Sequence, residues 1–152
     1  MVQAGAIKLT IESRYENVAL AGISINRICR EAGLTEQVAF EVEVSVVEAV
    51  NNAIRHAYCE KPGNEVEICL ELTPRIVNLK VADAGRPMPT EILHRPVAQS
   101  DSSDRPGEGG RGILIIQSLM DQVTYTTDGR KNVLSLCRNL AESGGSCDNH
   151  KD

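Results

Sequence analysis

The sequence has few aromatic residues and no long apolar run. Aromatic residues make up 3% of its 152 residues, with three tyrosines, one phenylalanine and no tryptophan. The hydrophobic core must therefore be built from aliphatic side chains. No apolar stretch approaches the roughly 20 residues of a membrane-spanning helix, and residues 1–10 lack the basic and apolar segments of a signal peptide. We therefore expect no membrane partner.

A basic excess and a pattern of cysteines are also missing. The chain has 16 Lys and Arg against 21 Asp and Glu, a formal net charge of −5, and no basic cluster of the kind that binds nucleic acids. Its five cysteines show no Cys-x-x-Cys spacing. An odd, unpatterned set of cysteines is typical of reduced thiols. These absences predict a cytoplasmic protein with no direct nucleic-acid partner.

A single domain is predicted over residues 1–140, because this length and a hydrophobic content of 41% suit one aliphatic core. The polar residues 141–152 are expected to form a disordered tail. Apolar alternation and helical spacing predict, in chain order, a strand at 6–12, helices at 15–30 and from Thr35, strands at 65–72 and 77–83, a helix at 110–121, and a hairpin of 123–127 with 132–138.

A long loop rich in Pro, Gly, Ser and Asp is predicted at residues 84–110. Loops of this length inside a compact domain are usually functional or disordered. Because a glycine-rich helix start follows, we expect a lid. Its segment 100–104, with the sequence SDSSD, is either part of a solvated lid or a regulatory site, and we favour the first.

One helix is predicted over residues 41–58, EVEVSVVEAVNNAIRHAY. Its spacing places Glu48, Asn52 and His56 on one polar stripe. An Asn oxygen can ligate Mg²⁺, which keeps several waters and takes few protein ligands. A carboxylate one turn earlier can accept a proton from an attacking hydroxyl or water. The same stripe is also typical of the solvated edge of an amphipathic helix.

An acidic turn follows at residues 81–87, VADAGRP. Strand parity directs Asp83 toward the core side, where a lone carboxylate is costly without a partner. Such a carboxylate can accept a hydrogen bond from the exocyclic amine of adenine. The commoner role of aspartate in Asp-x-Gly is a hydrogen bond to its own backbone.

A glycine cluster, GEGGRG, occupies residues 107–112. It matches G-x-G-x-x-G, but no strand precedes it, and it lacks the Gly-Lys-Ser/Thr end of a P-loop, so neither the dinucleotide fold nor the P-loop applies. The remaining possibilities are a row of N–H groups that binds an anion at a helix start and a flexible linker. Arg111 adds a permanent positive charge there.

Together, the three motifs resemble the boxes of a known family. Residues 48–58 resemble the N box of the GHKL ATPases, residues 81–87 their first glycine box and residues 109–123 their second. The element order also matches over residues 6–140, most closely in the anti-sigma-factor serine kinases of the RsbW and SpoIIAB type. This resemblance implies the Bergerat fold. That is an α/β (α+β) two-layer sandwich whose mixed, mostly antiparallel sheet carries three helices on one face.

The resemblance also implies roles for individual residues. Glu48 would be the general base and Asn52 the Mg²⁺ ligand. Asp83 would bind the adenine amine of ATP, and Gly85 would allow the backbone to approach the nucleotide. Many members have a second glycine where this chain has Pro87, which removes an N–H donor and fixes φ.

The phosphates of the nucleotide would lie at the start of the helix that follows the lid. By resemblance, Gly110, Arg111 and Gly112 would hold them. His56 shares the stripe of the metal ligand, and both nucleotide binding and packing beneath the nucleotide remain open for it.

The function implied by the resemblance is that of a serine/threonine protein kinase. It would use Mg-ATP to phosphorylate a serine on a STAS-domain anti-sigma-factor antagonist. It would also sequester a sigma factor or another regulatory protein, and a homodimer is a family expectation. A non-catalytic, nucleotide-gated binding module is the alternative, although such a module has no need of Glu48. The ATP-binding domain of a histidine kinase ranks below both, and a gyrase-type ATPase ranks lowest.

Overall fold

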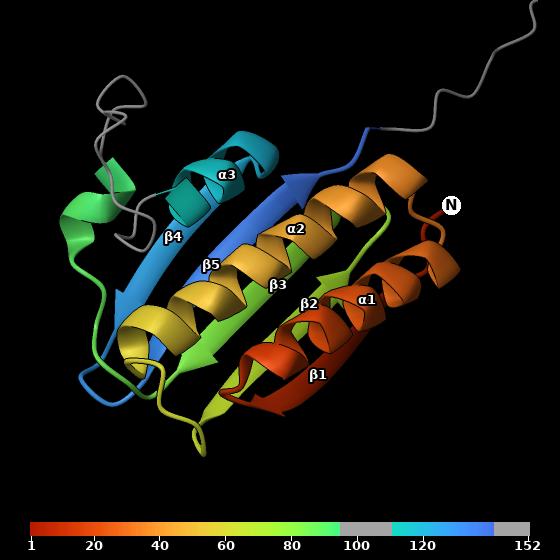
Figure 1. Ribbon diagram of the computed structural model, residues 1–152. Coiled ribbons are helices and arrows are strands. Elements are labelled where there is room, and N and C mark those ends of the chain that lie inside the picture. Colours follow the sequence, from red (N-terminus) through yellow and green to blue (C-terminus); the bar gives the residue numbers. More distant parts are fainter. Residues whose placement is uncertain (95–110, 142–152) are drawn as a thin grey trace, which may run out of the picture.

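The protein folds into two layers, a sheet and a set of helices on one of its faces (Figure 1). The structure, a computed structural model, describes residues 1–94 and 111–141. The strands are β1 (Gly5–Glu12), β2 (Glu65–Leu72), β3 (Ile76–Asp83), β4 (Gln122–Thr127) and β5 (Asn132–Asn139), and the longer helices are α1 (Tyr15–Glu31), α2 (Glu36–Asn52) and α3 (Arg111–Leu119). The predicted two-layer architecture with three helices on one face is therefore confirmed.

The described sheet has the strand order β1-β2-β3-β5-β4, and its pairings are all antiparallel, so the mostly antiparallel character is confirmed and the predicted mixture with parallel pairing is not found there. Its central strands alternate between buried and exposed positions, so that one face meets the helices. The fully buried aliphatic side chains are contributed by both layers. Among the largest are Ile25, Val42, Val46, Ile68, Leu70 and Leu79. No helix in the described part of the chain is long and apolar enough to cross a membrane.

The predicted helix over residues 41–58 is wrong in its last turn. Its start is as expected, because Thr35 caps α2 by accepting a hydrogen bond from the Val38 N–H at 3.2 Å. Residues Ala53–Ala57, however, form a π-helical turn, η1, with a hydrogen bond from the Tyr58 N–H to the Ala53 carbonyl at 3.0 Å. Such turns are rare and often mark functional sites.

The first part of the predicted 84–110 loop is ordered against other elements. It contains a 3₁₀ turn, η2 (Thr90–His94), and the Leu93 carbonyl accepts a hydrogen bond from Gln117 of α3 at 2.9 Å. The Met88 N–H donates to the Tyr125 hydroxyl of β4 at 2.8 Å. Several predictions lie outside the described residues: residues 95–110 of the predicted lid with the segment 100–104, residues 107–110 of the glycine cluster including Gly110, and almost all of the tail.

Candidate functional site

A narrow pocket lies where the end of α2 meets the end of β3 and the start of β5. Asn52 and His56 line it from the helix side, and Asp83 lines it from the sheet. The remaining walls are mostly apolar. They are formed by Ala49, Ala53, Ala57, Val81, Arg86, Met88, Ile113, Tyr125 and Leu134. The structure thus brings together three residues that the sequence placed in two separate motifs.

The start of α3 lies directly against the polar stripe of α2. A Cβ atom built on Gly112 would lie 2.8 Å from Glu48 Oε2 and 3.3 Å from Asn52 Oδ1. Only glycine therefore allows this approach without displacing Glu48. Arg111, the first residue of α3, is exposed beside them. The predicted base, the predicted metal ligand and the described part of the glycine cluster hence form one group.

Asp83 has the partner that its position requires. Its Oδ1 accepts hydrogen bonds from the Gly85 N–H at 3.0 Å and from Asn132 Nδ2 at 2.7 Å. Burial raises the pKa of the Asp83 carboxyl above its ordinary value, and these two hydrogen bonds oppose that rise. A hydrogen bond to the backbone and a hydrogen bond from an adenine amine are thus compatible roles for Asp83, because the backbone hydrogen bond uses Oδ1 only.

Gly85 allows the turn after β3 to approach the backbone of Ala57 closely. The Ala57 carbonyl oxygen occupies the place of a Gly85 Cβ atom, and the same oxygen accepts a hydrogen bond from the Arg86 N–H at 2.8 Å. The π-helical turn thus ends in a carbonyl that holds the turn after β3. This explains why a glycine stands at this position.

Two buried polar atoms in the pocket lack a hydrogen-bond partner among the described residues. They are Asn52 Nδ2 and His56 Nε2. Burial lowers the pKa of His56, as does the charge of Arg55, so the imidazole is neutral at pH 7. Unpaired buried polar groups are costly, and a ligand commonly satisfies them. The residues present therefore fit a polar ligand such as a nucleotide with its metal ion.

Sequence reasoning missed three side chains that shape this site. Asn132 is 2% exposed and donates a hydrogen bond to Asp83. The Tyr58 hydroxyl accepts a hydrogen bond from the Ala84 N–H at 2.8 Å, and the Tyr125 hydroxyl accepts one from the Met88 N–H. A signal existed for Asn132, because it shares strand parity with the buried Leu134 and Leu136. Asparagine is depleted in strands, so its position on the core face is informative.

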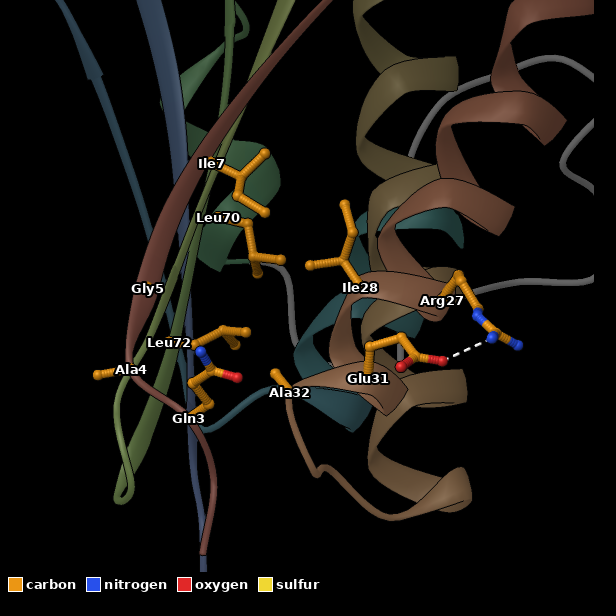
Figure 2. Close-up of a pocket in the computed structure, with 10 residues that line it drawn as sticks. All are labelled: Gln3, Ala4, Gly5, Ile7, Arg27, Ile28, Glu31, Ala32, Leu70 and Leu72. Atoms are coloured by element: carbon orange, nitrogen blue, oxygen red, sulfur yellow. Dashed lines mark ion pairs between the residues drawn. The ribbon is translucent and has the colours of Figure 1, made fainter.

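A second pocket lies at the other side of the molecule and contains none of the predicted site residues (Figure 2). Ile7, Leu70 and Leu72 of the sheet face Ile28 of α1 and Ala32, the C-cap residue of α1, across it. The ion pair between Arg27 and Glu31 lies beside it on α1, with a nitrogen–oxygen distance of 2.5 Å. This pocket is therefore apolar, with charged groups only at its rim.

Known proteins agree with this fold. Residues 11–138 match the family of histidine kinase-like ATPase domains, and the chain belongs to that family. Serine-protein kinase RsbW of Staphylococcus aureus is 30% identical over 122 residues, which cover 78% of this chain and 77% of the relative. Serine-protein kinase RsbW of Oceanobacillus iheyensis is 25% identical over 120 residues, 77% of this chain and 76% of the relative. The resemblance expected from the three motifs is thus confirmed.

A solved structure shares the fold at lower similarity. The histidine kinase domain of a blue-light activated histidine kinase from Erythrobacter litoralis superposes with a TM-score of 0.53 at 19% identity. The match covers 86% of this chain and 62% of that structure, so the chain spans less than two thirds of its length. This likeness concerns the fold alone.

Proposed function

We propose that the protein is a serine/threonine protein kinase that binds Mg-ATP in the pocket between α2, α3, the end of β3 and the start of β5. The observation that carries this proposal is the group formed by Glu48, Asn52 and Gly112 at the start of α3. It places a carboxylate beside an unpaired amide at a helix N-terminus. The relatives named serine-protein kinase support the same activity.

Different residues are proposed to bind the base and the phosphates of the nucleotide. Asp83 receives the exocyclic amine of adenine, and Gly85 keeps the turn beside it close to η1. Arg111 and the N–H groups at the start of α3 bind phosphate oxygens. The predicted Gly110 is assigned the same role, although it lies outside the described residues.

Asn52 is proposed to hold the metal ion together with phosphate oxygens and waters. In residues 1–94 and 111–141 no group of three His, Cys, Asp or Glu side chains is placed to hold a metal. A single amide oxygen suits Mg²⁺, which keeps most of its water ligands. Bound Mg-ATP supplies the phosphoryl group and the charge neutralisation that its transfer needs.

Glu48 acts as the general base in this proposal. Its carboxylate would accept the proton of the substrate serine hydroxyl as that oxygen bonds to the γ-phosphorus of ATP and the bond between this phosphorus and ADP breaks. This role requires Glu48 to stay close to the nucleotide, and its contact with Gly112 supports that position. A module that only bound partners would not need a carboxylate there.

The partners are proposed from the resemblance and the named relatives. The phosphate acceptor is a serine on a small STAS-domain antagonist, and the sequestered partner is a sigma factor or another regulatory protein in the cytoplasm. A homodimer of the chain is part of the same proposal.

A capture experiment tests the function. The tagged protein is incubated with lysate of its own cells, with Mg-ATP or without nucleotide, and retained proteins are scored for phosphoserine by mass spectrometry. We expect a small protein that is phosphorylated only with Mg-ATP. Glu48→Gln should lower its phosphorylation at least about 100-fold, the lower end of general-base effects.

Glu43→Gln is the matched control on the same helix. Glu43 is half-buried and bonds to Asn26 at 2.7 Å, outside the pocket. This variant should phosphorylate the captured protein at the wild-type rate. Capture without phosphate on any partner would favour a binding module, and full activity of Glu48→Gln would remove the assigned base.

A further inference from the structure

Asp83 and Asn132 face each other across neighbouring strands. They form a register pair of β3 and β5, although 49 positions separate them in the sequence. The Asn132 Nδ2 group donates to Asp83 Oδ1 at 2.7 Å and to the Gly85 carbonyl at 3.0 Å. Both amide hydrogens of this buried side chain are therefore used within the protein.

A third side chain fixes which way the Asn132 amide points. The Thr127 hydroxyl accepts a hydrogen bond from the Gly129 N–H at 3.3 Å and donates to Asn132 Oδ1 at 2.7 Å. Because Oδ1 receives this hydrogen, the NH₂ group must point toward Asp83. The amide thus bridges the β4–β5 hairpin and the turn after β3.

The Asp83 carboxylate is consequently held at one oxygen only. Oδ1 accepts from Gly85 and Asn132, whereas Oδ2 has no hydrogen bond to the described residues. A carboxylate oxygen that lines a pocket and has no partner is suited to a donor on a ligand.

We propose that Asn132 is a positioning residue that orients the Asp83 carboxylate so that Oδ2 selects nucleotides with an exocyclic amine on the base. Asn132 does not contact the base, because both of its amide hydrogens are engaged. This inference rests on the proposed nucleotide function and adds to Asp83, which selects the base, a positioning residue outside the three sequence motifs.

Tyr58 provides a matched control on the same turn. Its hydroxyl accepts a hydrogen bond from the Ala84 N–H at 2.8 Å and donates to the Glu65 carbonyl at 2.6 Å, without contacting the carboxylate. Tyr58→Phe therefore loosens the turn and leaves the Asn132–Asp83 hydrogen bond in place. A purely structural role for Asn132 would make variants of the two residues behave alike.

Calorimetric titration with two ligands tests the inference. ATP and purine riboside 5′-triphosphate share the phosphates and the sugar, but the second lacks the exocyclic amine. The wild-type protein should bind ATP on the order of tenfold or more tightly, as expected for a hydrogen bond to a charged group. In Asn132→Asp, this ratio of dissociation constants should approach one, because a second carboxylate would repel Asp83.

The remaining variants keep the test decisive. Thr127→Val should reduce the ratio at least twofold, and it carries the test if Asn132→Asp does not fold. Tyr58→Phe should weaken the binding of both ligands and preserve the ratio. If folded Asn132→Asp kept the wild-type ratio of dissociation constants, the role of Asn132 would be overturned and the nucleotide function would stand. If Asn132→Asp does not fold, the same result in Thr127→Val would have this meaning. A ratio near one in the wild-type protein would instead contradict the nucleotide role of Asp83.

Discussion

Two of the pockets in the described part of the molecule, the apolar pocket beside α1 and the polar pocket beside α2, differ in both size and chemistry. The apolar pocket beside α1 has about 310 Å³ of free space, whereas the pocket beside α2 has about 40 Å³. Small-molecule sites typically have roughly 300–1,000 Å³, so volume would favour the pocket beside α1 over the proposed nucleotide site. The smaller pocket is the one that contains unpaired buried polar atoms and a partnered carboxylate.

The polar groups of the pocket beside α2, and not its volume, distinguish it as the proposed nucleotide site. A nucleotide can enter the pocket beside α2 only if its walls move apart. Met88 is suited to this movement, because methionine is flexible and it is only half-buried. The apolar pocket, by contrast, is lined mainly by aliphatic side chains, together with the uncharged Gln3 and the ion pair of Arg27 with Glu31.

A pair of leucine truncations should separate the pockets most strongly. Leu70 lines the apolar pocket and Leu134 lines the pocket beside α2, and both are buried. Each change to alanine should lower the free energy of unfolding by about 2–5 kcal/mol in urea denaturation. Only Leu134→Ala should also weaken ATP binding by the folded protein, measured by calorimetry. Equal losses of ATP affinity would break the comparison.

A pair of glycine substitutions should give the next largest contrast. At Gly85, an alanine Cβ would collide with the Ala57 carbonyl, so Gly85→Ala should cost about 1–3 kcal/mol of stability and abolish ATP binding. Gly5 lines the apolar pocket and has nothing within 4 Å of a built Cβ. Gly5→Ala should therefore leave ATP affinity unchanged, and weak binding by this variant would contradict the assignment.

Acidic pH should weaken the site through Asp83. Because burial raises its pKa in the folded protein, Asp83 takes up a proton on acidification before an unfolded aspartate does, at pH above 3.8. The affinity ratio of ATP to purine riboside 5′-triphosphate should fall as pH drops through this raised pKa. Because both ligands carry the same phosphates, the titration of these phosphates affects both dissociation constants equally and does not change their ratio.

Stability should change in the opposite direction over the same range. The ionised carboxylate is the buried form that costs stability, so its cost is present above the raised pKa and is relieved as pH falls toward 3.8. Asp83→Asn should lack this dependence in urea denaturation from pH 7 to pH 4. An identical pH profile in the variant would show that another group titrates.

The ion pair beside the apolar pocket should have the smallest effect. Arg27 and Glu31 are largely exposed and four residues apart on α1. Arg27→Ala should change the free energy of unfolding by no more than about 0.5 kcal/mol and leave ATP affinity unchanged. A tenfold change in affinity would show that the two pockets communicate.

The sequence predicted the polar stripe and the acidic turn because each lies within a few residues of chain. Glu48 and Asn52 are one helical turn apart, and strand parity alone placed Asp83 toward the core. The pairing of Asp83 with Asn132 was not predictable in this way. It depends on the register of β3 with β5, two strands that are not consecutive in the sequence.

The π-helical turn shows a second limit of local reasoning. Residues 53–57 have ordinary helix-forming character, and the continuous α-helix predicted there was wrong. The turn coincides with the contact between the Ala57 carbonyl and the segment at Gly85 and Arg86, which is a tertiary interaction. The apolar pocket likewise arises from the spacing of α1 and the sheet, which no sequence motif encodes.

The most direct test of the central claim is methyl NMR of the isoleucine-labelled protein titrated with Mg-ATP. Ile113 lines the pocket beside α2, and Ile7 and Ile28 line the apolar pocket. We predict that the Ile113 methyl signal shifts with ATP concentration while those of Ile7 and Ile28 remain in place. Shifts at Ile7 and Ile28 with none at Ile113 would contradict the account.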